Sequence, residues 1–532
     1  MSLRNRLVLP MALSTLALLA GCGSSSNKAT PPPTGGFSKS DLSGTYVFST
    51  TGSDANGAPT SMAGTFSANG NGGIAGGTLD INDAEFTAPA TGLSITGGTY
   101  TVSVDGRGQA TLSVTTPFGN SVIVDFVLTS KSHGLITEFD NNGSGSGTLD
   151  IQSAATQAQL VGSYAFTLSG IDSNGNLPFG TVGSFTLGAD GIITSGVEDF
   201  NDTGFAYTNL TLSGTVLPQA TGAPWVATLT AVDSSDVSPF GTLTFDVYAV
   251  DATHLKFVEA DNFQNGFPLL AGDAFTQQGA SIPSSATTYV FTMAGGTQNS
   301  GPLTVGGVLP IDGAGAVSGG YIDINDAGTT TTAPLSFGGS YAASGSVGGR
   351  TLFNLSGFQV ASQFIAYPTT NAGLQVLESD SAGFLSGVAI PQSSSTFASG
   401  QGYGMNVSGF NSVEEDDIAE FTTTSTGFSG LVDLNDEGQA LSFDKTLTGT
   451  YQIDSPPSGR YDFVSPAFDG ELYVVDSSTA LFVELDATQV GIGTVQLQNE
   501  TQSARASRLI LPHRTVFPFA KNQKSAARWR HK

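Results

Sequence analysis

The sequence predicts an all-β protein of four tandem antiparallel modules, each of about 115 residues and about eight strands. The first observation is composition: only 12% of the chain is charged, 39% is hydrophobic and 69 residues are glycine. This is too apolar for a disordered chain and too rich in turn residues for a helical one. The second observation is one short pattern that returns four times. The third is the alternating apolar and polar runs, separated by turn pairs, between its copies.

The repeated pattern is Asp, an apolar residue, Asn, Asp, and we call it the signature. Its copies begin at Asp80, Asp199, Asp323 and Asp433, at spacings of 119, 124 and 110 residues. Such a period is too long for a solenoid repeat and indicates an array of small domains. Because alternate residues of a strand share a face, we expect the first Asp and the Asn of each copy to point the same way.

Four further landmarks recur in register with the signature. A Glu-x-Asp motif ends the seventh predicted strand, and Gly and Gln lie five apart in the last strand. A Gly-Arg turn occurs in modules 1, 3 and 4, and an aromatic pair opens modules 1 to 3, while module 4 keeps only Tyr403. The residues are Glu138/Asp140, Glu259/Asp261, Glu378/Asp380 and Glu484/Asp486; Gly147/Gln152, Gly272/Gln277, Gly387/Gln392 and Gly493/Gln498; Gly106/Arg107, Gly349/Arg350 and Gly459/Arg460; and Tyr46/Phe48, Tyr164/Phe166 and Tyr289/Phe291.

Eight short strands that follow one another in sequence need their edges protected, and closing the sheet removes edges altogether. We therefore predict an up-and-down barrel for each module, with a two-sheet sandwich as the alternative. The barrel loosely resembles the calycin type, but no family motif accompanies the likeness, so it implies no ligand. The predicted organisation is a signal peptide at 1–21, a flexible tether at 22–40, β modules at 41–153, 158–279, 285–393 and 398–500, and a basic tail at 501–532.

The N-terminus has the features of a secretion signal. Arg4 and Arg6 precede a mostly apolar run that is too short to span a bilayer comfortably. The run ends in Leu19-Ala20-Gly21-Cys22, which resembles the lipobox of bacterial lipoproteins. This resemblance covers residues 1–22 only. It implies lipidation of Cys22, the single cysteine, and, by analogy, an outer-membrane location because no Asp follows it. A secretory signal with an incidental cysteine is the alternative.

Charge divides the chain into an acidic body and a basic end. All 44 acidic residues and six bases lie between Asp41 and Ser503, giving this part a formal charge of −38. Such a surface repels phosphate backbones and excludes nucleic acid as a partner. Residues 504–532 hold eight bases and no acid. This tail is expected to be disordered, or to be an arm that contacts anionic lipid, lipopolysaccharide or the acidic body.

The signature is the best candidate for chemistry. Closely spaced oxygen ligands suit Ca²⁺, and the two carboxylates of the Glu-x-Asp motif could complete the shell if the fold brings them near. The alternative is a structural turn, because Asn and Asp side chains readily bond their own backbone. We assign no cofactor and no metal-ligating residue, and we keep Ca²⁺ as an open hypothesis.

Catalysis has little support in the sequence. Of the four histidines, His513 and His531 lie in the tail, while His133 and His254 occupy matching positions that we interpret as turn residues. Nucleophile elbows, metalloprotease helices and phosphate-binding loops do not occur in the sequence. We assign no catalytic residue and expect that the protein is not an enzyme.

These observations predict an extracytoplasmic lipoprotein, anchored in the bacterial envelope through Cys22. It would display repeated modules for surface interaction or a structural role. The alternative is a carrier that binds a small apolar ligand or a glycan within each barrel. The expected partners are the membrane and an unidentified component of the envelope or the cell exterior.

Overall fold

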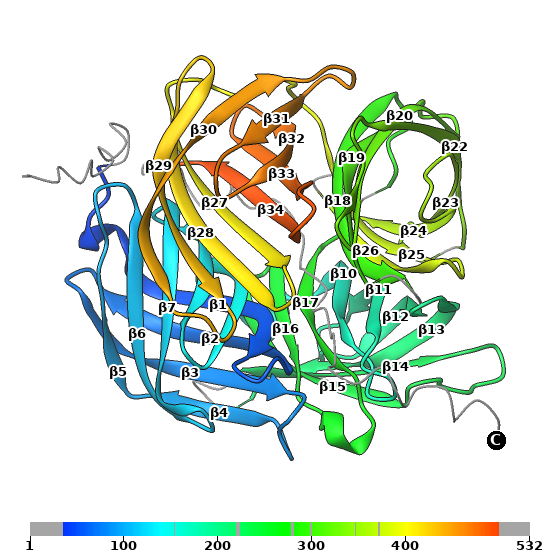
Figure 1. Ribbon diagram of the computed structural model, residues 1–532. Helices are drawn as coiled ribbons and strands as arrows, with labels where there is room; N and C mark the ends of the chain where they lie inside the picture. Colours follow the sequence, from blue (N-terminus) through cyan, green and yellow to red (C-terminus); the bar gives the residue numbers. More distant parts are fainter. Residues whose placement is uncertain are drawn as a thin grey trace, which may run out of the picture.

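The computed structural model describes residues 36–153, 155–219, 224–277, 281–297, 301–345, 347–370 and 373–499. The regular elements of this part of the chain are strands and three short 3-10 turns, and none of its helical elements is long and apolar enough to cross a membrane. The strands form four antiparallel barrels in chain order, modules 1 to 4 (Figure 1). The predicted all-β barrel architecture is therefore confirmed, and the sandwich alternative is wrong.

Modules 1 and 2 follow one plan, in which each strand pairs with the next and the last pairs with the first. The fourth strand of module 1 is divided into β4 and β5, and the 3-10 turns η1 (Lys39–Asp41) and η2 (Gln157–Gln159) precede the two barrels, while η3 (Phe263–Asn265) lies between β16 and β17. The strands are β1 (Ser43–Asp54), β2 (Pro59–Asn69), β3 (Gly73–Asp83), β4 (Ala90–Ile95), β5 (Gly97–Tyr100), β6 (Arg107–Thr116), β7 (Gly119–Ser130), β8 (His133–Asp140) and β9 (Gly143–Ile151); then β10 (Gly162–Ile171), β11 (Pro178–Leu187), β12 (Ile193–Asp202), β13 (Phe205–Leu217), β14 (Trp225–Val232), β15 (Thr242–Asp251), β16 (His254–Glu259) and β17 (Leu269–Thr276).

Modules 3 and 4 repeat this plan. Module 3 also divides its fourth strand, here into β21 and β22. The strands are β18 (Thr287–Thr297), β19 (Gly301–Ile311), β20 (Ala316–Asp326), β21 (Thr329–Thr330), β22 (Leu335–Ala343), β23 (Thr351–Ser356), β24 (Gln363–Pro368), β25 (Leu374–Glu378) and β26 (Gly383–Pro391); then β27 (Gly402–Phe410), β28 (Glu414–Thr423), β29 (Gly427–Asp436), β30 (Ser442–Ile453), β31 (Arg460–Val464), β32 (Asp469–Asp476), β33 (Thr479–Glu484) and β34 (Val490–Leu497).

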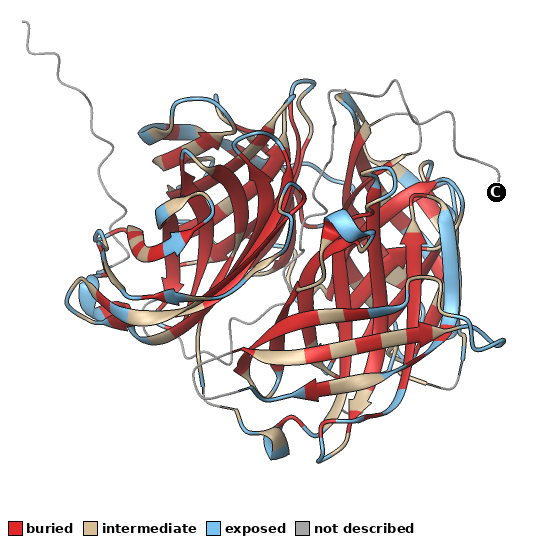
Figure 2. Cartoon of the chain, turned by 90° about the horizontal axis from the view of Figure 1, so that it is seen from below, coloured by how far each residue is buried: buried red, intermediate tan, exposed pale blue. Residues whose placement is uncertain are grey.

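Each barrel is filled by its own side chains. In β1, Tyr46 and Phe48 point into the core of module 1, whereas Val47 between them points outward and is equally buried. The same alternation gives each of the other barrels a core of aromatic and branched residues. On the strands that meet another module, the outward residues are buried because the neighbouring barrel covers them, and Figure 2 shows strands that are buried along much of their length.

The four barrels surround a common centre in chain order, which brings module 4 beside module 1 (Figure 1). Strands one and two of each module pack against strands six and seven of the following module, with module 1 following module 4. Small apolar clusters mark the four contacts. They include Val47 with Tyr248 and Val258 between modules 1 and 2, Val182 with Tyr367 and Leu377 between 2 and 3, Val308 with Tyr473 and Val483 between 3 and 4, and Ile418 with Val127 and Leu135 between 4 and 1.

The recurrent glycine of the last strand is required by close approach of the first strand. A Cβ at Gly147 would lie 1.8 Å from the backbone oxygen of Ser49. We predict that Gly147→Ala lowers the free energy of unfolding by about 1–3 kcal/mol, the usual cost of overpacking. Chemical denaturation would measure this. Gly119→Ala is the control, because a Cβ there meets no atom within 4 Å, and an equal effect of the two changes would contradict the prediction.

Candidate functional site

The signature residues join each module to the next. In β3, Leu79 and Ile81 point into the core of module 1, so Asp80 and Asn82 lie on the outer face of the barrel, toward module 2. Asp83, which follows, has the inward orientation of Leu79 and Ile81. The other three copies end β12, β20 and β29 and have the same arrangement.

The signature Asn holds the Glu-x-Asp corner of the following module. In every copy its Nδ2 donates to the backbone carbonyl oxygen of the Glu in that motif, and makes a second bond to the turn beyond. The fourth bond runs from module 4 back to module 1, so the series is cyclic. The Nδ2–O distances are 2.8 Å for Asn82 to Glu259, 2.9 Å for Asn201 to Glu378, 3.0 Å for Asn325 to Glu484 and 2.8 Å for Asn435 to Glu138.

The first Asp of the signature binds a Tyr, an Arg or both from the following module. Asp199 accepts hydrogen bonds from Tyr367 at 2.5 Å and from Arg350 Nη2 at 2.7 Å. Asp323 has the same pair of partners, Tyr473 at 2.5 Å and Arg460 Nε at 2.7 Å.

The two remaining joints each lack one of these partners. Asp80 has only the tyrosine, Tyr248 at 2.5 Å, because module 2 has no Gly-Arg turn. Asp433 has only the arginine, Arg107 Nη1 at 3.1 Å. In module 1, Val127 occupies the tyrosine position, eleven residues before Glu138. The arginine of each Gly-Arg landmark is therefore the cation of an ion pair between two modules.

The recurrent Gln of the last strand forms a second joint. Its Nε2 donates to the backbone oxygen of the residue that follows the Tyr or Val position in the next module. This series is also cyclic, because Gln498 at the end of module 4 returns to module 1. The distances are 2.9 Å for Gln152 to Ala249, 2.8 Å for Gln277 to Pro368, 2.8 Å for Gln392 to Val474 and 3.1 Å for Gln498 to Leu128.

A second group of acids lies inside one end of each barrel, where the last Asp of the signature and the Glu of Glu-x-Asp point inward. Burial raises the pKa of Asp83 to about 7, with a contribution from nearby Asp54. Burial and the neighbouring Asp380 raise the pKa of Glu378 to about 9. Burial also raises the pKa values of Glu138, Glu259 and Glu484 well above the usual range of a glutamate.

These inner acids do not form a metal site in the geometry observed. Across the described ranges, no group of three or more His, Cys, Asp or Glu side chains is placed to hold a metal ion. The fold does bring the Glu-x-Asp motif near the signature, but Asp80 and Asn82 point out of the barrel whereas Asp83 points in. Ca²⁺ binding by the signature stays a hypothesis. The contacts that the structure gives to the signature Asp and Asn include hydrogen bonds and ion pairs with the following module.

The two histidines of the body belong to a buried polar cluster between modules 1 and 2. They begin strands β8 and β16 beside two-residue turns, and each bonds an Asp on the last strand of its own module: His133 to Asp150 and His254 to Asp273, both at 2.8 Å. Lys256 Nζ lies between the two carboxylates, 3.7 Å from Asp150 and 3.5 Å from Asp273. The other ring nitrogen of each histidine is buried without a hydrogen-bond partner in the described structure, so no nucleophile is bonded to it.

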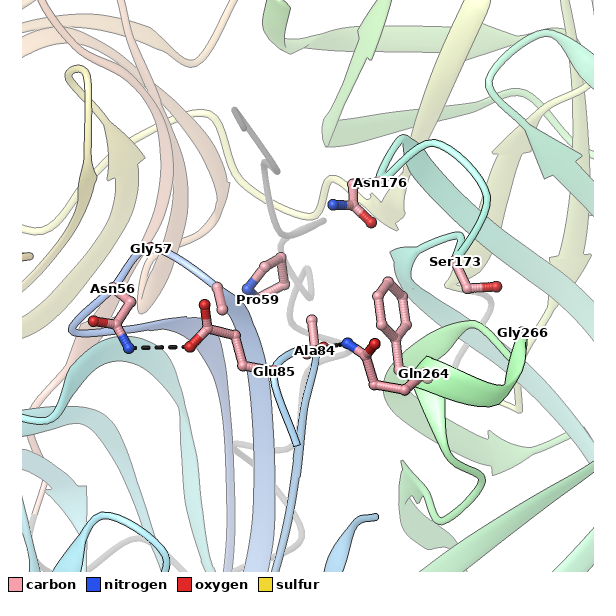
Figure 3. A pocket seen from close by; sticks show the side chains of 11 residues that line it. Asn56, Gly57, Pro59, Ala84, Glu85, Ser173, Asn176, Gln264 and Gly266 are labelled. Carbon is pink, nitrogen blue, oxygen red and sulfur yellow. Dashed lines mark hydrogen bonds between the residues drawn. The ribbon is translucent and has the colours of Figure 1, made fainter. Parts of the chain in front are cut away.

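A polar crevice opens where modules 1 and 2 meet at their turns. It has a volume of about 480 Å³ and lies between the β1–β2 and β3–β4 turns of module 1 and the β10–β11 turn and η3 of module 2. Figure 3 shows Asn56 and Glu85 on one side, with Ser173, Asn176 and Gln264 on the other. In module 3, the core contains an apolar cavity of only about 30 Å³.

Comparison with known proteins gives no family. The chain matches no family model, and no curated protein is significantly similar to it. Cys22 and the basic tail lie outside the described residues.

The joint residues that the sequence did not reveal as partners are Tyr248, Tyr367 and Tyr473. Each lies eleven residues before the Glu of a Glu-x-Asp motif, and this common spacing was the available signal. The signal is hard to recognise because module 1 has Val127 at that position. Because each tyrosine bonds a carboxylate 150 or 168 residues away, no local pattern indicates the pairing.

The unequal joints provide a matched test. Asp199→Asn leaves Arg350 buried without its carboxylate, so we predict a loss of about 3–5 kcal/mol of unfolding free energy. The same change at Asp80 replaces one of the two oxygens that accept from Tyr248 and Gly92 and leaves no cation unpaired, so it should cost about 1–2 kcal/mol. Denaturant unfolding of the full chain would measure both, and equal losses would contradict the assignment of the ion pair.

The inner acids make stability depend on pH. Between the ordinary pKa of 4.5 and about 9, folded Glu378 retains a proton that the unfolded chain has lost. By linkage, the free energy of unfolding therefore falls as pH rises through this window. We predict a lower melting temperature at pH 9 than at pH 6, and a flatter dependence in Glu378→Gln. Exposed Glu85→Gln is the control, and parallel curves for all three proteins would refute the explanation.

Proposed function

We propose that this protein is a lipid-anchored protein of the bacterial envelope, in which four barrels act as one non-catalytic scaffold for interaction or mechanical structure. The observation that carries the proposal is the cyclic set of joints. Asn435 and Gln498 tie module 4 to module 1, which the chain itself does not connect. Four modules held in this way present their turns and outer strands at fixed relative positions.

Such a scaffold suits multivalent contact. Equivalent surfaces on one rigid body can bind a repetitive partner without the entropy cost of ordering a flexible linker, and the second contact then profits from a high effective concentration. Outside the joints, strands four and five of a barrel present residues to solvent that alternate with core residues, as in β13 from Leu210 onward and in β14. These outer strands are the surfaces offered to a partner.

The proposal that the protein is non-catalytic is supported by the positions of its buried histidines and acids. The two His–Asp pairs are buried in the joint between modules 1 and 2, and the acids with raised pKa values occur in all four barrels. A raised pKa often marks an active site, but structural networks produce it too. Here the fourfold repetition favours a structural origin.

The alternative function is that of a carrier, and the crevice between modules 1 and 2 favours a glycan as its ligand. The crevice lies between two barrels, whereas the sequence predicted a ligand within each barrel. Its volume and its amide, hydroxyl and carboxylate groups suit a polar ligand such as a sugar. The cavity of about 30 Å³ in the core of module 3 holds no more than about one water-sized group. Binding of a small apolar ligand inside that barrel would require displacement of its core.

Lipidation at Cys22 is the testable foundation of the proposal. We predict that Cys22→Ser abolishes labelling by radioactive palmitate and releases the protein from membranes washed with high salt and carbonate. The physical reason is that acyl chains supply stable anchoring that a short tether cannot. Ser24→Ala is the control. Retention of Cys22→Ser in the washed membrane would overturn the anchor.

A further inference from the structure

The joint between modules 1 and 2 differs from the other three joints in the partner of its signature Asp. In those three joints an arginine of the following module lies against that carboxylate. The pairs are Asp199 with Arg350, Asp323 with Arg460 and Asp433 with Arg107. Asp80 has no such arginine, because module 2 has no Gly-Arg turn. It accepts hydrogen bonds from the hydroxyl of Tyr248 and the backbone N–H of Gly92, and neither donor carries a charge.

A second buried carboxyl group, that of Asp246, lies beside Asp80. Asp246 precedes Tyr248 by two residues on β15, so both side chains point from the outer face of the barrel toward module 1. Asp246 is only 8% exposed, and in the described part of the chain it makes no hydrogen bond and no ion pair. Burial and the nearby charge of Asp80 raise the pKa of Asp246 to about 7. The joint therefore buries two carboxyl groups that repel each other.

The equivalent acids of other modules have a donor or a cation of their own. In module 1 the equivalent residue is Asp125, which accepts a hydrogen bond from Gln109 Nε2, its neighbour across the strand pair, at 2.9 Å. In module 4 it is Glu471, which lies 2.7 Å from an arginine Nη2. The cross-strand neighbour of Asp246 is Val226, whose side chain has nothing to donate. Asp246 therefore lacks the partner that the fold provides at the same position elsewhere.

The chain has no base left for this joint. Module 2 contains a single base, Lys256. Its Nζ lies 2.6 Å from Thr148 Oγ1 and is shared by the two aspartates of the histidine cluster, so it is already paired. Two buried carboxylates without a cation are unfavourable, and they must either hold a proton or bind a cation from solution. Oxygen ligands of this kind suit hard divalent cations, and Mg²⁺ in particular is held by one or two carboxylates with water as the other ligands.

We propose that Asp80 and Asp246 bind one hard divalent cation, Ca²⁺ or Mg²⁺, which takes the role that an arginine has in the other joints. The two carboxylates supply the charge, and water supplies the ligands that the protein does not. The other three signature copies do not form equivalent sites, because an arginine already neutralises each of them. The contact between modules 1 and 2 would then strengthen with the concentration of the cation, whereas the other joints would not. This inference adds a site to the proposed scaffold and does not rest on the lipid anchor.

Isothermal titration calorimetry of the full chain tests the site, with Ca²⁺ and Mg²⁺ titrated separately at pH 8, where Asp246 is ionised. Moderate salt screens loose attraction of cations to the acidic surface. We expect one ion per chain for at least one of the two cations. Asp246→Asn should weaken this binding by about tenfold or more, because one of two charged ligands is lost. Asp125→Asn is the matched control at the equivalent position of the joint between modules 4 and 1, and it should leave the affinity unchanged.

Thermal melts show whether the variant is folded. In EDTA, Asp246→Asn should melt no lower than the unsubstituted chain, because the change removes a buried negative charge beside Asp80. Saturating cation should raise the melting temperature of the unsubstituted chain by several degrees and leave that of Asp246→Asn unchanged.

Three results would overturn the proposal: binding of neither cation, equal weakening by Asp246→Asn and Asp125→Asn, or four equivalent ions per chain. If neither cation binds and Asp246→Asn melts higher at pH 8, the two acids share a proton and the site is not a cation site. None of these measurements depends on acylation, so failure of the lipid anchor would leave their outcome unaffected.

Discussion

The structure depends on one contact, in which the carboxamide of the signature Asn holds the backbone of the next module's Glu-x-Asp corner. It occurs between every consecutive pair and again between module 4 and module 1. A head-to-tail contact of this kind generates either an open filament or a ring, according to the rotation it imposes. Here four rotations close, so tandem repetition produces a compact body and not an extended array.

The four joints share the hydrogen bonds of the signature Asn and the recurrent Gln, but the other side chains that meet there differ. These differences specify which modules pair with each other. Between modules 2 and 3 an arginine and a tyrosine hold the signature Asp, whereas the contact of modules 4 and 1 has Arg107 with Val127. Modules 1 and 2 enclose Lys256 with two aspartates, whereas at the matching position of the joint between modules 3 and 4 Leu481 lies in an apolar cluster. An exchanged pair would bury an unpaired charge, which costs far more than the exchange of one apolar contact for another.

The sequence was sufficient for the strands and the barrels because both follow from local alternation and turn chemistry. It also located the joint residues, since Asp80, Asn82, Arg107 and Gln152 all belong to recurrent landmarks. Their partners could not be inferred: Asn82 bonds a carbonyl 177 residues away, and Asn435 one 297 residues away. A turn and a Ca²⁺ site were the two local interpretations of the signature, and a contact between modules is a third that only the tertiary arrangement reveals.

The arrangement also changes the meaning of the acidic composition. Several of the carboxyl groups counted in the formal charge lie inside barrels with raised pKa values, and others pair with the four bases buried at the joints. The charge presented to solvent is therefore less negative than the composition states, and more uneven. Four of the seven bases in the described part of the chain are buried at the joints, so its exposed positive charge is limited to Lys39, Lys131 and Lys445.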